Sequence, residues 1–190
     1  MITSLLDVKR LEAGEMPLSC LECDLRDVAR AAVTPFAALV GENRLVLEEP
    51  PASVQAMCDE GIVRRVIANL VNNALKFAPN GSQVRVKIVK DGEYTRLSVS
   101  DRGPGIPPEY QTNIFEKFAQ VAGREIEHST GLGLTFCKLA IETHGGSIGV
   151  KSEVGLGSIF WFSLPGPSTN GKLSMGRSTG GNHNRWTPTI

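Results

Sequence analysis

A β-hairpin pattern at residues 84–101 constrains the fold of this chain more than any other feature of its sequence. The stretches VRVKIVK and EYTRLSVSD alternate apolar and polar residues on either side of the dipeptide Asp91-Gly92. Such alternation is typical of strands, and Asp-Gly is a preferred two-residue turn between antiparallel strands. The sequence therefore predicts an antiparallel pair here.

Helical and strand patterns alternate along the whole of residues 18–165. Apolar periodicity and capping residues predict four helices, at about 24–40, 59–77, 107–118 and 132–144. Further short strands are predicted near 44–48 and 54–57, and at 147–153 and 158–165. Antiparallel strands with helices that can cover one face predict a two-layer α/β sandwich.

Two flanking pieces differ from this middle region. Residues 1–17 have apolar residues at near-helical spacing and end at Gly14 and Pro17, so they resemble the end of a longer helix. Residues 166–190 are dominated by Gly, Ser, Thr and Asn, a composition that predicts a disordered tail. We therefore expect one domain of residues 18–165 between a helix end and a tail.

Charge and cysteine usage limit the classes of partner. Twenty basic and twenty acidic residues cancel, so no overall field favours nucleic acid or an anionic membrane. We expect Cys20, Cys23, Cys58 and Cys137 to be reduced and mostly packed, with a zinc or redox role for the Cys20-x-x-Cys23 pair as the alternative. The chain shows no signal-peptide pattern and no run of about 20 apolar residues, which predicts a cytoplasmic fragment, although the parent protein could be membrane-bound.

The stretch ANLVNNALKFAPNG, residues 68–81, places asparagines on a helix with a good apolar face. Asn69, Asn73 and Lys76 are spaced by four and three residues and share one stripe beside that face. Amide oxygens suit a hard cation such as Mg²⁺, and an ammonium group suits a phosphate. A solvated polar face is the alternative explanation.

The stretch SVSDRGPGIPPE, residues 98–109, ends a strand with a carboxylate. Asp101 falls on the same face as Leu97 and Val99. A carboxylate there can accept a hydrogen bond from the exocyclic amine of adenine, while Gly103 and Gly105 allow the backbone to approach the base. Alternatively, Asp101 caps the turn before Gly103.

The stretch HSTGLGLTFCKLAIETHGG, residues 128–146, opens a helix with glycines. Unpaired amides at a helix N-terminus form an anion site when glycines at 131 and 133 allow close approach. A simple turn is the alternative.

Taken together and in this order, these motifs resemble the catalytic ATP-binding domain of sensor histidine kinases. This domain belongs to the GHKL superfamily, with gyrase, the heat-shock chaperone of ninety kilodaltons and MutL. NLVNNALKFAP resembles the N box, DRGPGI the G1 box, IFEKF the F box, STGLGL the G2 box and GLGSIF the closing glycine motif. LLDVKRLEAG resembles the end of the second helix of the dimerisation and phosphoacceptor domain. The resemblance implies a Bergerat fold, in which three helices cover one face of a mixed, mostly antiparallel sheet and a mobile ATP lid covers the site.

The resemblance also implies ATP and Mg²⁺ as cofactors and assigns roles to particular residues. Asn73 becomes the Mg²⁺ ligand and, with Lys76, a catalytic residue, while Asn69 lies near the phosphates. Asp101 becomes the residue that recognises adenine. The other implied nucleotide-binding residues shape the base pocket, anchor a lid at about 119–130, or border the triphosphate: Gly103, Gly105, Ile106, Phe115, Phe118, Ser129, Thr130, Gly131, Leu132, Gly133 and Leu134.

Two departures from the family pattern concern the chemistry. Ser129 stands at the first position of the usual G-x-G-L-G-L pattern, and Asn72 stands where the family often has an acidic residue. The related hydrolases place a water-activating glutamate where this chain has Asn69. An amide cannot accept a proton at neutral pH, which favours transfer to a protein histidine over hydrolysis.

The acceptor histidine is expected on another piece of protein. His128 lies in the predicted lid, His144 at a helix end and His183 in the tail, so none occupies a dimerisation helix. The expected partners are a dimerisation and phosphoacceptor domain and the receiver domain of a response regulator. A non-catalytic nucleotide-dependent interaction module and a serine kinase of the anti-sigma type are the alternatives.

Overall fold

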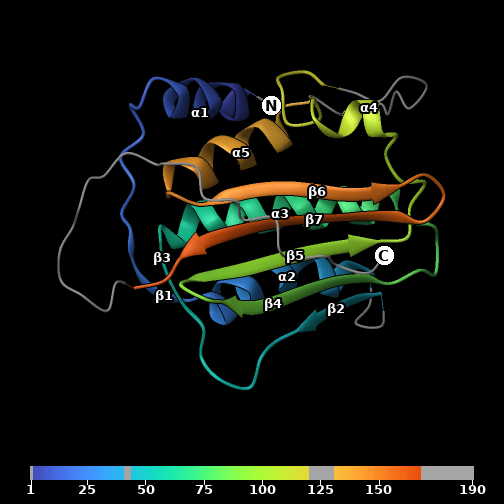
Figure 1. Ribbon diagram of the computed structural model, residues 1–190, viewed down its shortest axis with the longest axis horizontal. Helices are drawn as coiled ribbons and strands as arrows, with labels where there is room; N and C mark the ends of the chain where they lie inside the picture. Colours follow the sequence, from blue (N-terminus) through green and yellow to red (C-terminus); the bar gives the residue numbers. More distant parts are fainter. Residues whose placement is uncertain (1, 41–43, 120–130, 168–190) are drawn as a thin grey trace.

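The computed structural model describes residues 2–40, 44–119 and 131–167, which form two layers (Figure 1). One layer is a five-stranded sheet in the order β2-β4-β5-β7-β6, and the other consists of helices packed on one of its faces. The elements in chain order are α1 (Ile2–Glu12), β1 (Leu21–Asp24), α2 (Leu25–Val40), β2 (Leu45–Glu48), β3 (Gln55–Cys58), α3 (Glu60–Phe77), β4 (Val84–Asp91), β5 (Tyr94–Asp101), α4 (Pro108–Gln111), α5 (Gly133–Thr143), β6 (Ser147–Glu153) and β7 (Gly157–Pro165).

The sheet is mixed and mostly antiparallel. Strands β4 and β5 form the predicted hairpin, with Asp91 paired to Tyr94 across its turn. Strand β7 pairs antiparallel with both β5 and β6, whereas β2 runs parallel to β4. Strands β1 and β3 form a separate antiparallel ladder, of which β1 was not predicted. Helices α2, α3 and α5 pack against the sheet, so the predicted sandwich is confirmed.

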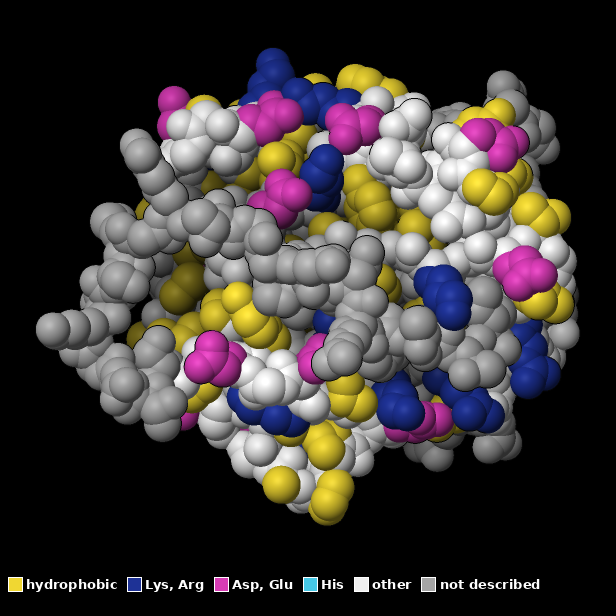
Figure 2. All heavy atoms as spheres, viewed as in Figure 1, with side chains coloured by type: hydrophobic (Ala, Val, Ile, Leu, Met, Phe, Trp, Pro, Cys, Tyr) yellow, Lys and Arg dark blue, Asp and Glu magenta, His cyan; other side chains and the backbone are white. Residues whose placement is uncertain are grey.

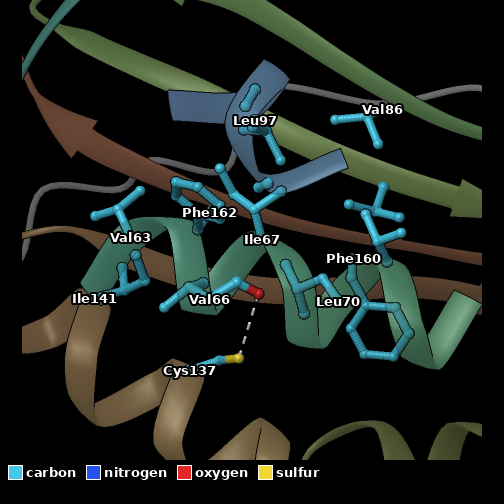
Figure 3. Packing of buried hydrophobic residues seen from close by; sticks show 14 of the residues in the cluster. Val63, Val66, Ile67, Leu70, Val86, Leu97, Cys137, Ile141, Phe160 and Phe162 are labelled. Carbon is cyan, nitrogen blue, oxygen red and sulfur yellow. Dashed lines mark hydrogen bonds between the residues drawn. The ribbon is translucent and has the colours of Figure 1, made fainter. Parts of the chain in front are cut away.

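Helix α3 lies at the centre of the core, packed on the sheet between α2 and α5. Its N-cap Asp59 accepts a 3.1 Å hydrogen bond from the Ile62 amide, and it ends at Ala78 before a proline. The buried side chains of α3 recur at helical spacing and face Leu97 and Phe162 of the sheet on one side and Cys137 of α5 on the other (Figure 3). The stripe next to this buried face is therefore held in a fixed position.

The segment after β5 corrects one prediction. A helix was expected over residues 107–118, but α4 spans Pro108–Gln111 and is followed by turns. The side-chain amide of Gln111 donates to the carbonyls of Ile106 and Ser152 at 2.8 and 2.9 Å. These bonds tie the short helix to β6 and keep the chain close to the sheet edge.

Helix α1 packs on α5 (Figure 1). Val8 and Leu11 are buried in the main core, Asp7 forms an ion pair with Arg65 of α3, and Glu12 forms one with Lys117 at 2.7 Å. The domain boundary at residue 17 stays a prediction from sequence.

The surface agrees with the balanced composition. On the face viewed in Figure 2, the described Lys and Arg side chains lie among Asp and Glu side chains. Within residues 2–40, 44–119 and 131–167, no helix has the length and hydropathy needed to cross a membrane.

Candidate functional site

Asn69, at the start of the polar stripe of α3, lies near the beginning of α5. Asn69 and Asn73 are half-buried and one turn apart, and Lys76 is exposed in the next turn. A Cβ atom placed on Gly133 would lie 4.0 Å from the side-chain oxygen of Asn69. The structure therefore brings Asn69 together with the glycine motif that was predicted to bind phosphate.

The first turn of α5 has the features of an anion site. Its N-cap is Leu132, whose side chain makes no capping hydrogen bond. The first amides of a helix have no intrahelical acceptor and carry a partial positive charge, so they attract phosphate oxygens. Leu132 is buried and Leu134 half-buried, so both would contribute through the backbone.

Asp101 is the last residue of β5 and is 8% exposed. Its Oδ1 accepts a 2.7 Å hydrogen bond from the Gly103 amide. Burial raises the pKa of this carboxyl, an effect opposed by the backbone amides of Gly103 and Ser158. Asp101 thus does cap the turn, but a carboxylate has about four acceptor sites, so it also has capacity for an adenine amine.

The loop after Asp101 is pressed between two elements. A Cβ atom on Gly103 would lie 2.9 Å from the Phe77 carbonyl at the end of α3. Gly105 has φ +68°, and its Cβ would lie 1.9 Å from the Glu153 carbonyl at the end of β6. Both positions therefore require glycine. Ile106, the next predicted pocket residue, is half-buried, and its amide donates to a serine hydroxyl of β6 at 2.8 Å.

The F-box phenylalanines have different environments. Phe115 is buried and packs edge-to-face on Phe160, with ring centroids 6.4 Å apart. Phe118 is 63% exposed with φ +60°, and its amide donates to the Gly131 carbonyl at 3.2 Å. The Phe118 and Gly131 backbones are therefore adjacent. Ser129 and Thr130 lie outside the described residues, as does most of the predicted lid.

His144 has a structural role. Its ring is buried; Nε2 accepts a 3.0 Å hydrogen bond from the Asp59 amide, and Nδ1 lies 2.6 Å from the Ala140 carbonyl. This pattern requires the neutral tautomer with the proton on Nδ1. His144 is therefore a hydrogen-bonding residue at the end of α5. His128 and His183 lie outside the described residues.

Sequence reasoning missed several neighbours of the site. Arg65, one turn before Asn69, stacks over the Phe136 ring at 4.1 Å, and the buried Cys137 contacts α3. A Cβ on Gly157, in the closing glycine motif, would lie 2.1 Å from the Asp101 carbonyl, so β7 closely supports the end of β5. Arg65 lies four residues before Asn69, and Cys137 lies four residues after Gly133. This helical spacing could have indicated from sequence that both residues lie near the site.

The donor chemistry of the site fits Mg²⁺. Among the residues that the structure describes, no three His, Cys, Asp or Glu side chains are grouped to hold a metal ion, and the four cysteines are free. The candidate oxygen donors are the amides of Asn69 and Asn73, and amide oxygens are suitable ligands for a hard cation.

Comparison with known families agrees with this geometry. The profile of the family described as histidine kinase-, DNA gyrase B-, and HSP90-like ATPase matches residues 58–168. Sensor histidine kinase TmoS of Ectopseudomonas mendocina is 34% identical over 86% of this chain and 17% of its own length. Alginate biosynthesis sensor protein KinB of Pseudomonas aeruginosa is 38% identical over 87% of this chain and 28% of its own length. The chain thus spans less than a third of either relative.

Solved structures share the fold. Full-length ShkA in complex with AMPPNP superposes with a TM-score of 0.73 and 30% identity, over 87% of this chain and 35% of that chain. The catalytic domain of histidine kinase ThkA gives a TM-score of 0.69 and 26% identity, over 80% of this chain and 97% of its own.

Proposed function

Because this chain belongs to the histidine kinase-, DNA gyrase B- and HSP90-like ATPase family, as an ATPase domain of the sensor kinase type, we propose that it binds Mg·ATP and phosphorylates a histidine. The acceptor histidine belongs to a dimerisation domain outside this chain, and the phosphoryl group passes on to the receiver domain of a response regulator in the cytoplasm. The observation that carries the proposal is the approach of Asn69 on α3 to Gly133 in the first turn of α5.

Asp101 supplies specificity for the base. Its buried carboxylate accepts a hydrogen bond from the exocyclic amine of adenine, and the adjacent glycine loop, packed on the ends of α3 and β6, holds the carboxylate in place. Guanine carries a carbonyl oxygen at the equivalent position, which faces the carboxylate with like partial charge. We therefore expect ATP to bind much more tightly than GTP.

The phosphate end of the site consists of the polar stripe of α3 and the first turn of α5, and it supplies charge and orientation. The amides at the start of α5 hold phosphate oxygens, and Lys76, exposed in the turn of α3 after Asn73, would supply a positive charge to them. Asn73, with Asn69 beside it, would hold Mg²⁺, which when bound neutralises phosphate charge. In the transfer, an imidazole nitrogen of the acceptor forms a bond to the γ-phosphorus while the bond to the ADP oxygen breaks, and ADP leaves. Positioning and charge stabilisation account for most of the catalysis in such a reaction.

The α3 stripe favours transfer over hydrolysis. Asn69 and the exposed Asn72 are amides that cannot remove a proton from water at neutral pH. The proposed division of the chain is residues 1–17 as the end of a dimerisation helix, 18–165 as the ATP-binding domain and 166–190 as a tail.

Calorimetric titration with Mg·ATP and Mg·GTP tests the binding part of this proposal. We expect saturable ATP binding with at least about tenfold weaker GTP binding, from one lost and one repulsive contact. Equal affinity for the two nucleotides would contradict the role of Asp101. No binding of either would contradict the proposed function.

A further inference from the structure

A serine near the end of β6 lies in one row with Asp101. Ser152 is half-buried and pairs with Ser158 of β7, and Ser158 pairs with Asp101 of β5. Residues that pair across neighbouring strands present their side chains on the same face of a sheet. The three polar side chains therefore follow one another across the end of the sheet at which β5 and β6 finish and β7 begins (Figure 1).

The single hydroxyl proton of Ser152 determines the direction of three hydrogen bonds. The Gly157 carbonyl can only accept, so Ser152 Oγ donates to it, at 2.7 Å. The Ile106 amide can only donate, and it donates to the same Oγ at 2.8 Å. Ser158 Oγ lies 2.9 Å from Ser152 Oγ and is the donor of this pair, because the Ser152 proton is already used. Ser152 Oγ thus makes one donated and two accepted bonds, the full capacity of a hydroxyl.

These bonds connect the loop of Gly103 and Gly105 to two strands at once. Ile106 is the residue after Gly105, so its bond to Ser152 holds the end of the loop on β6. The same hydroxyl is bonded to the first two residues of β7, the strand that pairs with β5. At its other end, the loop donates the Gly103 amide to Asp101 Oδ1 at 2.7 Å. A chain of hydrogen bonds and loop backbone therefore runs from Ser152 to the carboxylate.

We propose that Ser152 is a positioning residue for adenine recognition, because its hydroxyl holds the loop that orients the Asp101 carboxylate. Hydrogen bonds weaken steeply when distance or angle departs from the preferred geometry. If the loop shifts, the Gly103 amide moves with it, and Asp101 loses the orientation in which its other acceptor sites meet the adenine amine. This inference rests on the proposed function, in which Asp101 recognises adenine.

A purely structural role for Ser152 makes a different prediction. If its hydroxyl only stabilises the end of the sheet, its removal lowers the free energy of unfolding and leaves the preference for ATP over GTP unchanged. If it positions the loop, ATP loses more affinity than GTP, because the guanine carbonyl makes no hydrogen bond to Asp101 that could be lost. Ser147 is the matched control, since it is also half-buried but begins β6, at the end of the strand away from the loop.

The binding experiment titrates the 190-residue chain and its variants with Mg·ATP and with Mg·GTP. We expect Ser152→Ala to weaken Mg·ATP binding about fivefold, the effect of one lost hydrogen bond, and Mg·GTP binding by no more than about twofold. Ser152→Thr should keep Mg·ATP affinity near the wild-type value, because it keeps the hydroxyl on the same carbon. Ser147→Ala should leave both affinities unchanged.

Three binding results would each overturn the proposal. The first is undiminished Mg·ATP affinity in a folded Ser152→Ala protein. The second is an equal loss of affinity for the two nucleotides. The third is a folded Ser152→Thr protein that binds Mg·ATP as weakly as Ser152→Ala.

Hydrogen exchange without nucleotide separates this proposal from the proposed function. In the ligand-free protein, exchange of the Ile106 amide should accelerate about fivefold or more in Ser152→Ala, relative to the amides of β5 as a reference for global stability. It should stay near the wild-type rate in Ser152→Thr and Ser147→Ala. An unchanged Ile106 rate in Ser152→Ala would overturn the positioning role whether or not the protein binds ATP. Absence of Mg·ATP binding by the wild-type chain would overturn the proposed function instead.

Discussion

At the end of β5, Asp101 is 8% exposed and bonded to the Gly103 amide, whereas on α3 the amides of Asn69 and Asn73 are half-buried and Lys76 is exposed. Asp101 and the loop of Gly103 and Gly105 form the base end of the site. Backbone atoms of this loop pack tightly against the ends of α3 and β6. The phosphate end is built by side chains of α3 and backbone amides of α5, two helices that are distant in sequence. We infer that the base end is preformed and supplies affinity, while the phosphate end supplies the chemistry.

The largest expected effect tests whether the base end is rigid. Gly105→Ala should lower the free energy of unfolding by about 3 kcal/mol or more, because the new Cβ would strike the Glu153 carbonyl in a left-handed backbone conformation. Gly155→Ala is the matched control, since it has φ +85° but nothing within 4 Å of its Cβ. It should cost only about 1 kcal/mol. Urea denaturation measures the free energy of unfolding of each variant. Equal losses in the two variants would show that the loop adjusts to the added Cβ and that the base end is not preformed.

The next effect separates affinity from stability at Asp101. Asp101→Asn should weaken ATP binding by about 1–3 kcal/mol, because the amide cannot keep both the Gly103 bond and an acceptor for adenine. A titration of each protein with Mg·ATP measures this loss. Undiminished affinity would contradict the assignment of the base end.

Although Asp101→Asn should weaken ATP binding, it should not lower the free energy of unfolding at pH 7. Burial raises the pKa of Asp101, so the folded protein binds a proton more readily than the unfolded chain, and stability is lost as the pH rises through the raised pKa. At pH 7 the neutral asparagine removes this cost, so the variant should be at least as stable as wild type. The advantage should vanish below the ordinary carboxyl pKa of about 4. A variant less stable than wild type at pH 7 would show that the charge itself holds the loop.

The sequence was sufficient to predict where Asp101 lies, but it predicted less of the arrangement at the phosphate end. Alternation along residues 84–101 indicated the hairpin and put Asp101 at a strand end, because strand periodicity and the Asp-Gly turn are local signals. The approach of Gly133 to Asn69 is a contact between two helices, so periodicity predicted each stripe but not their meeting. Cys137 could be recognised as buried from sequence, but its hydrogen bond to the Val66 carbonyl could not.

Two features of the fold also depended on tertiary contacts. Strand β1 exists because it pairs with β3, and its four residues carry a weak propensity signal. The helix expected over residues 107–118 ends at Gln111 and is followed by turns, and the Gln111 side chain bonds to the carbonyls of Ile106 and Ser152. Helical periodicity gives no signal for such contacts with a distant strand.

The smallest expected effect concerns the metal. Asn73→Ala should weaken Mg·ATP binding by about 1 kcal/mol and leave adenosine binding unchanged, since its amide is proposed to act through the ion. Asn72→Ala is the control, because Asn72 is exposed on the same helical turn and lies outside the stripe. Titrations with and without Mg²⁺ measure both. A parallel loss of adenosine binding would show that Asn73 also acts on the base, and it would contradict the division of the site into a base end and a phosphate end.

Incubation with labelled ATP tests the proposed phosphoryl transfer to a histidine outside this chain. Incubated alone with Mg·ATP, the chain should accumulate no phosphohistidine. With a dimerisation domain added in trans, acid-labile and base-stable label should appear slowly on the added domain, since no tether raises its effective concentration. The account would be contradicted by acid-stable label on the partner, or by stoichiometric label on His128, His144 or His183 that Asn73→Ala abolishes.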